Sequence, residues 1–260
     1  MENLERSSDW LQGLRELNSV IAATGRPLSG NLFYDDLQPD YLDSPPNAHT
    51  RPKRDRFRAA VNGRDRLLEV GVNGGHSAYL ALTSNPDIEF HGVDICAHPY
   101  VRSAMAQLSR AFPGRVYFHG GDCRTVLPDL AAQGLRFDVF HIDGAKHLCF
   151  SDVLHCSRMI AADEATVIVD DTQLNSVAWV WRTCERHGLI ESDPAFPPLP
   201  AALHDQNKIG RIRPVSCWMW ALLFHCHARL PVIVSPLVTT VRQLIHRQQK
   251  SAIYFGEERP

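Results

Sequence analysis

The sequence predicts an α/β protein built on a doubly wound, mostly parallel sheet with helices on both faces. Two observations carry this prediction. Apolar runs of strand length alternate with helical segments from Arg66 to about Glu191, and several of these runs end in an acidic residue. In open sheets of this kind a ligand lies beyond the carboxyl ends of the strands, so the acidic residues should gather at one binding edge.

Residues 1–62 are expected to form an N-terminal helical segment that acts as a lid over this edge. Apolar side chains recur at helical spacing over residues 9–24, with Ser8 or Asp9 as the N-cap. A second helix is expected from about residue 54 to residue 62.

A long loop over residues 31–52 separates these two helices, and loops of that length are often lids or binding elements. Its aromatic residues Phe33, Tyr34 and Tyr41 are interpreted either as substrate contacts or as packing residues. The basic run over residues 51–58 predicts the solvated start of a helix rather than a binding site for nucleic acid.

The central domain is expected to span residues 63–214, and its first strand, Arg66 to Val70, leads into a glycine-dense turn. The turn reads Gly71-Val72-Asn73-Gly74-Gly75, and a helix follows from about Ser77. Glycine permits positive φ and lets a ligand approach the backbone, while Asn73 tolerates the left-handed region. Because the second and third glycines of the dinucleotide fingerprint are absent, the turn favours another nucleoside.

The second and third strands also end near carboxylates. Residues 89–94 end in Asp94, which stands where a carboxylate can accept hydrogen bonds from both hydroxyls of a ribose. Residues 115–120 form the third strand, and Asp122 follows it. Asp122 is either a pocket residue or the N-cap of the helix over residues 124–132, and the two roles do not exclude each other.

The fourth and fifth strands, residues 137–144 and 165–171, bring three more carboxylates to the edge: Asp143, Asp170 and Asp171. Burying several negative charges together is costly unless a cation compensates them. Oxygen ligands suit Mg²⁺, so these three residues are predicted to bind it. The alternative is that the acidic pair ends a strand and caps the next helix, which needs only one residue.

The glycine turn resembles the first motif of class I S-adenosylmethionine-dependent methyltransferases, an acidic residue followed by Gly-x-Gly-x-Gly. Glu69, Gly71, Asn73 and Gly75 stand in those places, with Asn73 replacing the central glycine. The resemblance implies a Rossmann-like, seven-stranded fold with S-adenosylmethionine as cofactor. It implies that an acidic residue at Asp122 contacts the adenine amino group. The predicted cofactor-binding residues are Glu69, Gly71, Asn73, Ser77, Gly75, Asp94, Asp122 and Asp143.

The acids of strands four and five resemble those of the metal-dependent O-methyltransferases of the catechol and macrolide-sugar types. Asp170 and Asp171 follow Asp143 by 27 and 28 residues, a spacing close to that of these families. The resemblance supports a general base at Lys146, the position used in the catechol type, or at the neighbouring His147. Lys146 is preferred by position and would need its pKa lowered by burial and a cation, whereas His147 would need no shift.

The C-terminal third is less regular. A seventh strand is expected over residues 208–213, antiparallel and beside the fifth and sixth strands, after a proline-rich segment over residues 192–203. Residues 215–260 are predicted to form a helical extension used for packing or dimerisation, or a lid over an apolar substrate. Its apolar runs are shorter than the roughly 20 residues of a membrane span.

The composition bounds the class of protein. A chain of 260 residues with 44% hydrophobic and 22% charged residues can bury a sizeable core, and a formal charge of −2 argues against partners bound by bulk attraction to phosphate. Seven scattered cysteines and a polar N-terminus without a signal peptide predict a cytoplasmic protein.

The sequence therefore predicts an enzyme that transfers the methyl group of S-adenosylmethionine to a hydroxyl of a small molecule, such as a natural product, with Mg²⁺ assistance. The alternatives are a metal-independent methyltransferase, a catalytically silent cofactor-binding subunit of another enzyme and, more distantly, a nicotinamide oxidoreductase.

Overall fold

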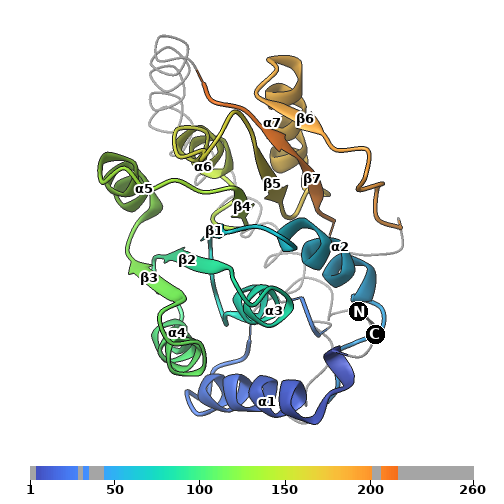
Figure 1. The fold of residues 1–260 in the computed structure, drawn as a ribbon, viewed down its shortest axis with the longest axis vertical. Coiled ribbons are helices and arrows are strands. Elements are labelled where there is room, and N and C mark those ends of the chain that lie inside the picture. The colour runs from blue at the N-terminus through green and yellow to red at the C-terminus, as the bar shows by residue number, and fades with distance from the viewer. Residues whose placement is uncertain (1–3, 29–31, 35–43, 201–205, 216–260) are drawn as a thin grey trace, which may run out of the picture. The chain divides into compact units, whose positions relative to one another are not determined.

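The computed structural model describes residues 4–28, 32–34, 44–200 and 206–215, which form a seven-stranded sheet with helices on both faces (Figure 1). The strand order is β3-β2-β1-β4-β5-β7-β6, with β7 antiparallel to both of its neighbours. The strands are β1 (Arg66–Val70), β2 (Glu89–Asp94), β3 (Val116–Gly120), β4 (Val139–Ile142), β5 (Ala165–Val169), β6 (Ile190–Ser192) and β7 (Lys208–Ile212). The predicted fold and the antiparallel seventh strand are confirmed.

The register of the sheet sets the geometry of its binding edge. Val70 lies opposite Val93 on one side and Ile142 on the other, and Ile142 lies opposite Val169. The residues that leave these four strands are therefore level with one another. The strand order reverses between β1 and β4, which is the switch point where ligands bind in doubly wound sheets.

Two helical layers bury the apolar faces of the sheet. One layer contains α2, α3 and α4, with α1 packed on α4, and the other contains α5, α6 and α7 (Figure 1). The helices are α1 (Ser8–Ala22), α2 (Arg51–Val61), α3 (His76–Ser84), α4 (Tyr100–Ala111), α5 (Cys123–Ala132), α6 (Cys149–Cys156) and α7 (Asn175–Arg186), and the short 3₁₀ helix η1 (Leu4–Arg6) precedes them.

The two N-terminal helices start earlier than predicted. Ser7, rather than Ser8 or Asp9, caps α1, because its hydroxyl accepts a hydrogen bond from the backbone N–H of Trp10. Helix α2 begins at Arg51, since Pro52 fits a first turn, where the missing N–H has no partner to lose.

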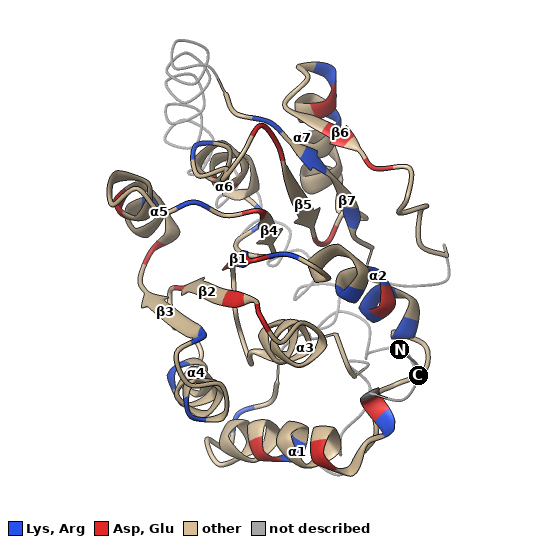
Figure 2. Ribbon diagram, viewed as in Figure 1, with Lys and Arg blue, Asp and Glu red and all other residues tan. Residues whose placement is uncertain are grey.

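The basic run on α2 is not a solvated helix start, so that prediction is wrong. Figure 2 shows basic positions in blue on α2, and of these Lys53, Arg54 and Arg58 are buried. Arg54 donates to both carboxylate oxygens of Glu5 at 3.0 Å, and Arg58 forms an ion pair with the same residue at 3.2 Å. These ion pairs compensate the burial of the guanidinium groups and fix α2 to the N-terminal segment.

Phe33 and Tyr34 serve packing. Both are buried, and the Phe33 ring lies edge-on to Trp10 with centroids 5.5 Å apart. The Asn18 amide donates to the Tyr34 hydroxyl at 2.9 Å. Tyr41 and residues 216–260, and with them the predicted C-terminal extension, lie outside the described residues. Among the described helices, none combines the length and the apolar character needed to cross a membrane.

Candidate functional site

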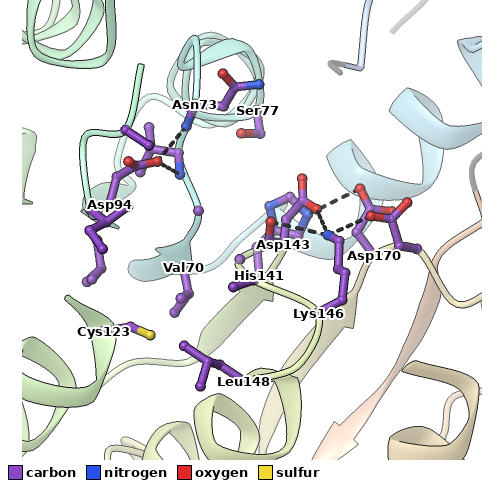
Figure 3. A pocket seen from close by; sticks show the side chains of 18 of the residues that line it. Val70, Asn73, Ser77, Asp94, Cys123, His141, Asp143, Lys146, Leu148 and Asp170 are labelled. Atoms are coloured by element: carbon purple, nitrogen blue, oxygen red, sulfur yellow. Dashed lines mark hydrogen bonds and ion pairs between the residues drawn. The ribbon is translucent and has the colours of Figure 1, made fainter. Parts of the chain in front are cut away.

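A pocket of about 740 Å³ opens at the carboxyl ends of β1, β2, β4 and β5, a volume typical of small-molecule sites (Figure 3). The turn after β1 supplies one part of its wall and the loop after β4 supplies another. Of the predicted site residues, the following line it: Gly71, Asn73, Ser77, Asp94, Asp122, Asp143, Lys146, His147, Asp170 and Asp171.

The glycine turn fits closely against the loop after β4. Gly71 has a φ of 89°, and a Cβ atom there would lie 2.6 Å from the backbone oxygen of Asp143. Asn73 also has a positive φ, 52°, and its side-chain oxygen accepts a hydrogen bond from the Tyr100 hydroxyl at 2.8 Å. Only glycine at position 71 permits both the conformation and the close contact.

Asp94 closes the turn from the side of β2. Its carboxylate accepts hydrogen bonds from the backbone N–H groups of Val72 and Asn73, both at 3.0 Å, and of Cys96 at 2.7 Å. A carboxylate has about four acceptor sites, so one remains for a ligand.

Asp122 is the N-cap of α5, which is one of the two roles that the sequence predicts for it. Its carboxylate accepts from the backbone N–H of Arg124 at 2.9 Å and from the Arg124 guanidinium. These hydrogen bonds lower the pKa of Asp122. Since Asp122 also lines the pocket, the cap leaves its predicted role with the adenine open.

Two predicted cofactor residues, Glu69 and Gly75, do not line the pocket. Glu69 is buried beneath the wall, where it accepts a hydrogen bond from the Ser77 hydroxyl and lies 2.7 Å from Nδ1 of His141. Gly75 precedes α3 with a φ of 76° and packs against Leu108. Both residues therefore support the wall from behind.

The three carboxylates predicted from strands four and five do gather, and two lysines lie among them. Figure 3 shows Lys146 between Asp143 and Asp170. Nζ of Lys146 is 2.7 Å from Asp143 and 2.5 Å from Asp171. Nζ of Lys53, from α2, is 2.8 Å from Asp170. Lys53 was missed because its basic run carries no sign of a contact with a residue more than a hundred positions away.

These ion pairs set the protonation states of the cluster. Burial alone would lower the pKa of Lys146, but Asp143 and Asp171 outweigh it and raise that pKa, opposite to the shift expected of a general base. Burial and the charge of Asp170 raise the pKa of Asp143. For Asp171, Lys146 outweighs the effect of burial and lowers the pKa.

His141, in β4, is a further member of the cluster. It is buried, and Nε2 lies 4.0 Å from Asp170. Within the described residues, Nε2 of His141 and Oδ1 of Asp170 are buried without a hydrogen-bond partner. Donor atoms of His141, Asp143 and Asp170 lie within 4.8 Å of one another. This donor set fits a divalent cation.

His147, the second candidate for the base, is exposed on the rim of the same pocket.

A comparison with protein families matches residues 68–172 to a model described as a methyltransferase domain. The matched residues include most of the glycine turn region and the acidic cluster, so this part of the chain is similar to a methyltransferase domain, in line with the resemblance seen in the sequence.

Solved structures show the same fold at low identity. An O-methyltransferase from Bacillus cereus, in complex with S-adenosylhomocysteine, is 16% identical to this chain and superposes on it with a TM-score of 0.56. The aligned region covers 78% of this chain and 90% of the Bacillus cereus chain. The O-methyltransferase TomG from Streptomyces achromogenes, involved in tomaymycin synthesis and solved with S-adenosylmethionine, has 18% identity and a TM-score of 0.55 over 78% and 90% of the two chains.

A curated relative, a tRNA (guanine-N(7)-)-methyltransferase from Ruegeria sp. (strain TM1040), is 31% identical over 106 residues, 39% of this chain. The match spans only 40% of that relative's length, so its substrate does not transfer to this chain.

Proposed function

We propose that this chain transfers the methyl group of S-adenosylmethionine to a hydroxyl oxygen of a small-molecule acceptor, assisted by a divalent cation. The observation that carries the proposal is one pocket with two chemically different walls. The glycine turn and Asp94 form the first, and a cluster of carboxylates and lysines forms the second.

The first wall suits the cofactor, which when bound supplies an electrophilic methyl group on sulfur. Asp94 has one acceptor site left for a ribose hydroxyl, and the turn from Gly71 to Gly74, with a glycine at each end, lines the pocket. Asp122 lies on the wall at the start of α5, where the adenine amino group is expected. The S-adenosyl complexes of the two O-methyltransferases with this fold support the assignment.

The second wall suits the acceptor. The resemblance predicts a divalent cation, with Mg²⁺ at Asp143, Asp170 and Asp171 as the expectation from the sequence, and a bound cation would lower the pKa of an acceptor hydroxyl. Lys146 would orient that hydroxyl and, after releasing its own proton to solvent, would accept the hydroxyl proton in its neutral form; His147 is the alternative base. The base must lie within hydrogen-bond reach of the hydroxyl, which favours Lys146 because it sits inside the cluster.

The test separates binding from turnover. Asp143→Ala and Asp170→Ala should abolish methyl transfer to a panel of hydroxylated acceptors, while calorimetry still detects S-adenosylhomocysteine. Activity that survives EDTA would favour a metal-independent enzyme. Cofactor binding without turnover across the panel would favour a silent subunit, and a lack of affinity for S-adenosylhomocysteine would reject the proposal.

The base is tested by two variants. Lys146→Ala should lower kcat by about 10²–10⁴ with little change in cofactor affinity, whereas His147→Ala should be milder. A larger loss in His147→Ala would move the role to the histidine.

The proposal includes a cytoplasmic homodimer in which residues 215–260 contribute to packing or to the dimer surface. The odd number and scattered spacing of the cysteines in the sequence support a reducing compartment. Light scattering of the full chain measures the oligomeric state.

A further inference from the structure

We propose that the cation site in this pocket is built from His141, Asp143 and Asp170, with Glu69 behind the histidine, and that it takes a first-row transition-metal ion in preference to Mg²⁺. The inference rests on the proposed function only in that it names the ligands and the class of its cation. Asp171, the third ligand expected from the sequence, has a different task.

The orientation of His141 is fixed from behind. Nδ1 lies 2.7 Å from a carboxylate oxygen of Glu69, and both residues are buried. An ionised carboxylate only accepts hydrogen bonds, so Nδ1 carries the hydrogen and Nε2 is left as the donor atom toward a cation. Metal-binding histidines commonly have such a carboxylate behind them, which orients the ring and raises its basicity. The Ser77 hydroxyl, which donates to the same carboxylate, helps to hold Glu69 in place.

The front of the ring faces the acidic cluster. Nε2 is 4.0 Å from Oδ2 of Asp170, and no described residue gives Nε2 or Oδ1 of Asp170 a hydrogen bond, although both atoms are buried. Such atoms are costly unless a ligand satisfies them. Asp143 completes the set, with donor atoms of the three residues within 4.8 Å of one another. Small side-chain movements bring atoms at that spacing to ligand distances of about 2.0–2.2 Å from one ion.

Asp171 is engaged elsewhere. Its Oδ2 lies 2.5 Å from Lys146, and the Gln173 amide donates to its Oδ1 at 3.0 Å. Both of its oxygens therefore have partners. Asp170 differs, because Lys53 holds its Oδ2 and leaves Oδ1 for the cation. The two adjacent acids therefore have different roles: Asp170 binds the ion, and Asp171 holds Lys146.

The donor set decides the class of ion. Mg²⁺ prefers oxygen ligands and is seldom bound by imidazole. One imidazole nitrogen with two carboxylates is a set that suits Fe²⁺, Co²⁺ or Zn²⁺, whose affinity for nitrogen is higher, and it also accepts Mn²⁺, which prefers oxygen ligands but tolerates an imidazole better than Mg²⁺ does. The histidine therefore shifts the preference of the site away from Mg²⁺.

Metal binding can be measured without turnover. Chelator-treated full-length protein is titrated with Co²⁺, followed by its visible absorption, and with Mn²⁺ and Mg²⁺ by calorimetry. We expect Mn²⁺ and Co²⁺ to bind at one site at least tenfold more tightly than Mg²⁺. His141→Ala should weaken Mn²⁺ at least 100-fold, and Glu69→Gln about 10–100-fold as expected for a residue behind a ligand.

Two variants serve as controls. Asp171→Asn should change Mn²⁺ affinity less than threefold, and so should His91→Ala, which removes another buried histidine of the same sheet. Affinity for S-adenosylhomocysteine and circular dichroism report folding in every variant, and His141→Asn replaces His141→Ala if the latter unfolds.

Mg²⁺ binding as tight as Mn²⁺ binding would overturn the inference, as would a larger loss of affinity in Asp171→Asn than in His141→Ala. Wild-type protein that binds S-adenosylhomocysteine but none of the three ions would overturn it and leave methyl transfer standing. Protein that binds the ions but not S-adenosylhomocysteine would reject the proposed function and support the metal site.

Discussion

The two walls of the pocket hold their carboxylates in opposite ways. On the β1–β2 side, Asp94 is bound by three backbone N–H groups. On the β4–β5 side, Asp143, Asp170 and Asp171 are bound by the side chains of Lys53 and Lys146. The first arrangement is fixed by the course of the main chain, whereas the second depends on two long side chains.

This difference separates a rigid subsite from an adjustable one. Backbone donors cannot leave Asp94 without opening the turn, so that wall is shaped before a ligand arrives. An ammonium group can exchange a carboxylate for a substrate oxygen or yield it to a cation. The lysines also differ: the Lys53–Asp170 pair is buried, with side chains 7% and 6% exposed, whereas Lys146 is 30% exposed.

The largest effect should come from disturbing the close contact between Gly71, in the glycine turn, and the backbone of Asp143, in the loop after β4. Gly71→Ala combines a strained φ, costing about 1–3 kcal/mol, with a clash against the Asp143 backbone, costing a similar amount, so the free energy of unfolding should fall by about 2–6 kcal/mol. Urea unfolding measures it. Gly134→Ala is the matched control, because Gly134 has a φ of 80° and open space around its Cβ position. Equal losses of unfolding free energy in both variants would mean that the contact between Gly71 and the Asp143 backbone adds nothing to the strain of a positive φ.

The buried lysine should matter to stability more than the part-exposed one. Lys53→Ala leaves Asp170 buried with one partner fewer, and breaking a buried ion pair typically costs about 3–5 kcal/mol. Lys146→Ala removes more exposed pairs and should cost about 1 kcal/mol or less. Urea unfolding of both variants, with Asp170→Asn completing a double-mutant cycle, checks the order. If Lys146→Ala proves the more destabilising, the contrast between the two lysines fails.

Changing Asp94, which the backbone N–H groups hold, should lower the affinity for the cofactor product S-adenosylhomocysteine. Asp94→Ala removes the acceptor for ribose and releases the turn, so S-adenosylhomocysteine should bind more weakly by about 2–4 kcal/mol in calorimetry. Asp138→Ala is the control, since Asp138 accepts from the backbone N–H groups of Asp65 and Arg66 outside the pocket. It should lower stability and leave the affinity unchanged. A similar affinity loss in both variants would show that Asp94 acts only through folding.

The smallest effect concerns His76, a buried histidine that follows the glycine turn at the start of α3. Burial lowers the pKa of His76 to about 3, from an ordinary value of 6.5. Between those two values the unfolded state binds a proton that the folded state does not, so stability rises with pH. From pH 5 to pH 7 the contribution is about 2 kcal/mol. His76→Gln should reduce the difference in unfolding free energy between these pH values by that amount, and an unchanged difference would contradict the assignment.

Much of the fold follows from local patterns. The strand limits of Arg66–Val70 and Glu89–Asp94 agree with those predicted from the sequence, because a local signal marks each end: Gly71 follows the first strand and the carboxylate of Asp94 ends the second. The helix starts were less accurate, since Ser7 and Pro52 decide them and neighbouring residues offer competing caps.

For the site, too, one part could be predicted from the sequence and another could not. Sequence alone determined that carboxylates follow four parallel strands, and parallel register is enough to bring such residues to one edge. Only the tertiary structure decided what compensates them: Lys53 arrives from a helix that precedes the sheet, and His141 turns its unpartnered nitrogen toward Asp170. The physical reason is that strand order follows from local periodicity, whereas the pairing of charges depends on where distant segments and side-chain rotamers meet in space.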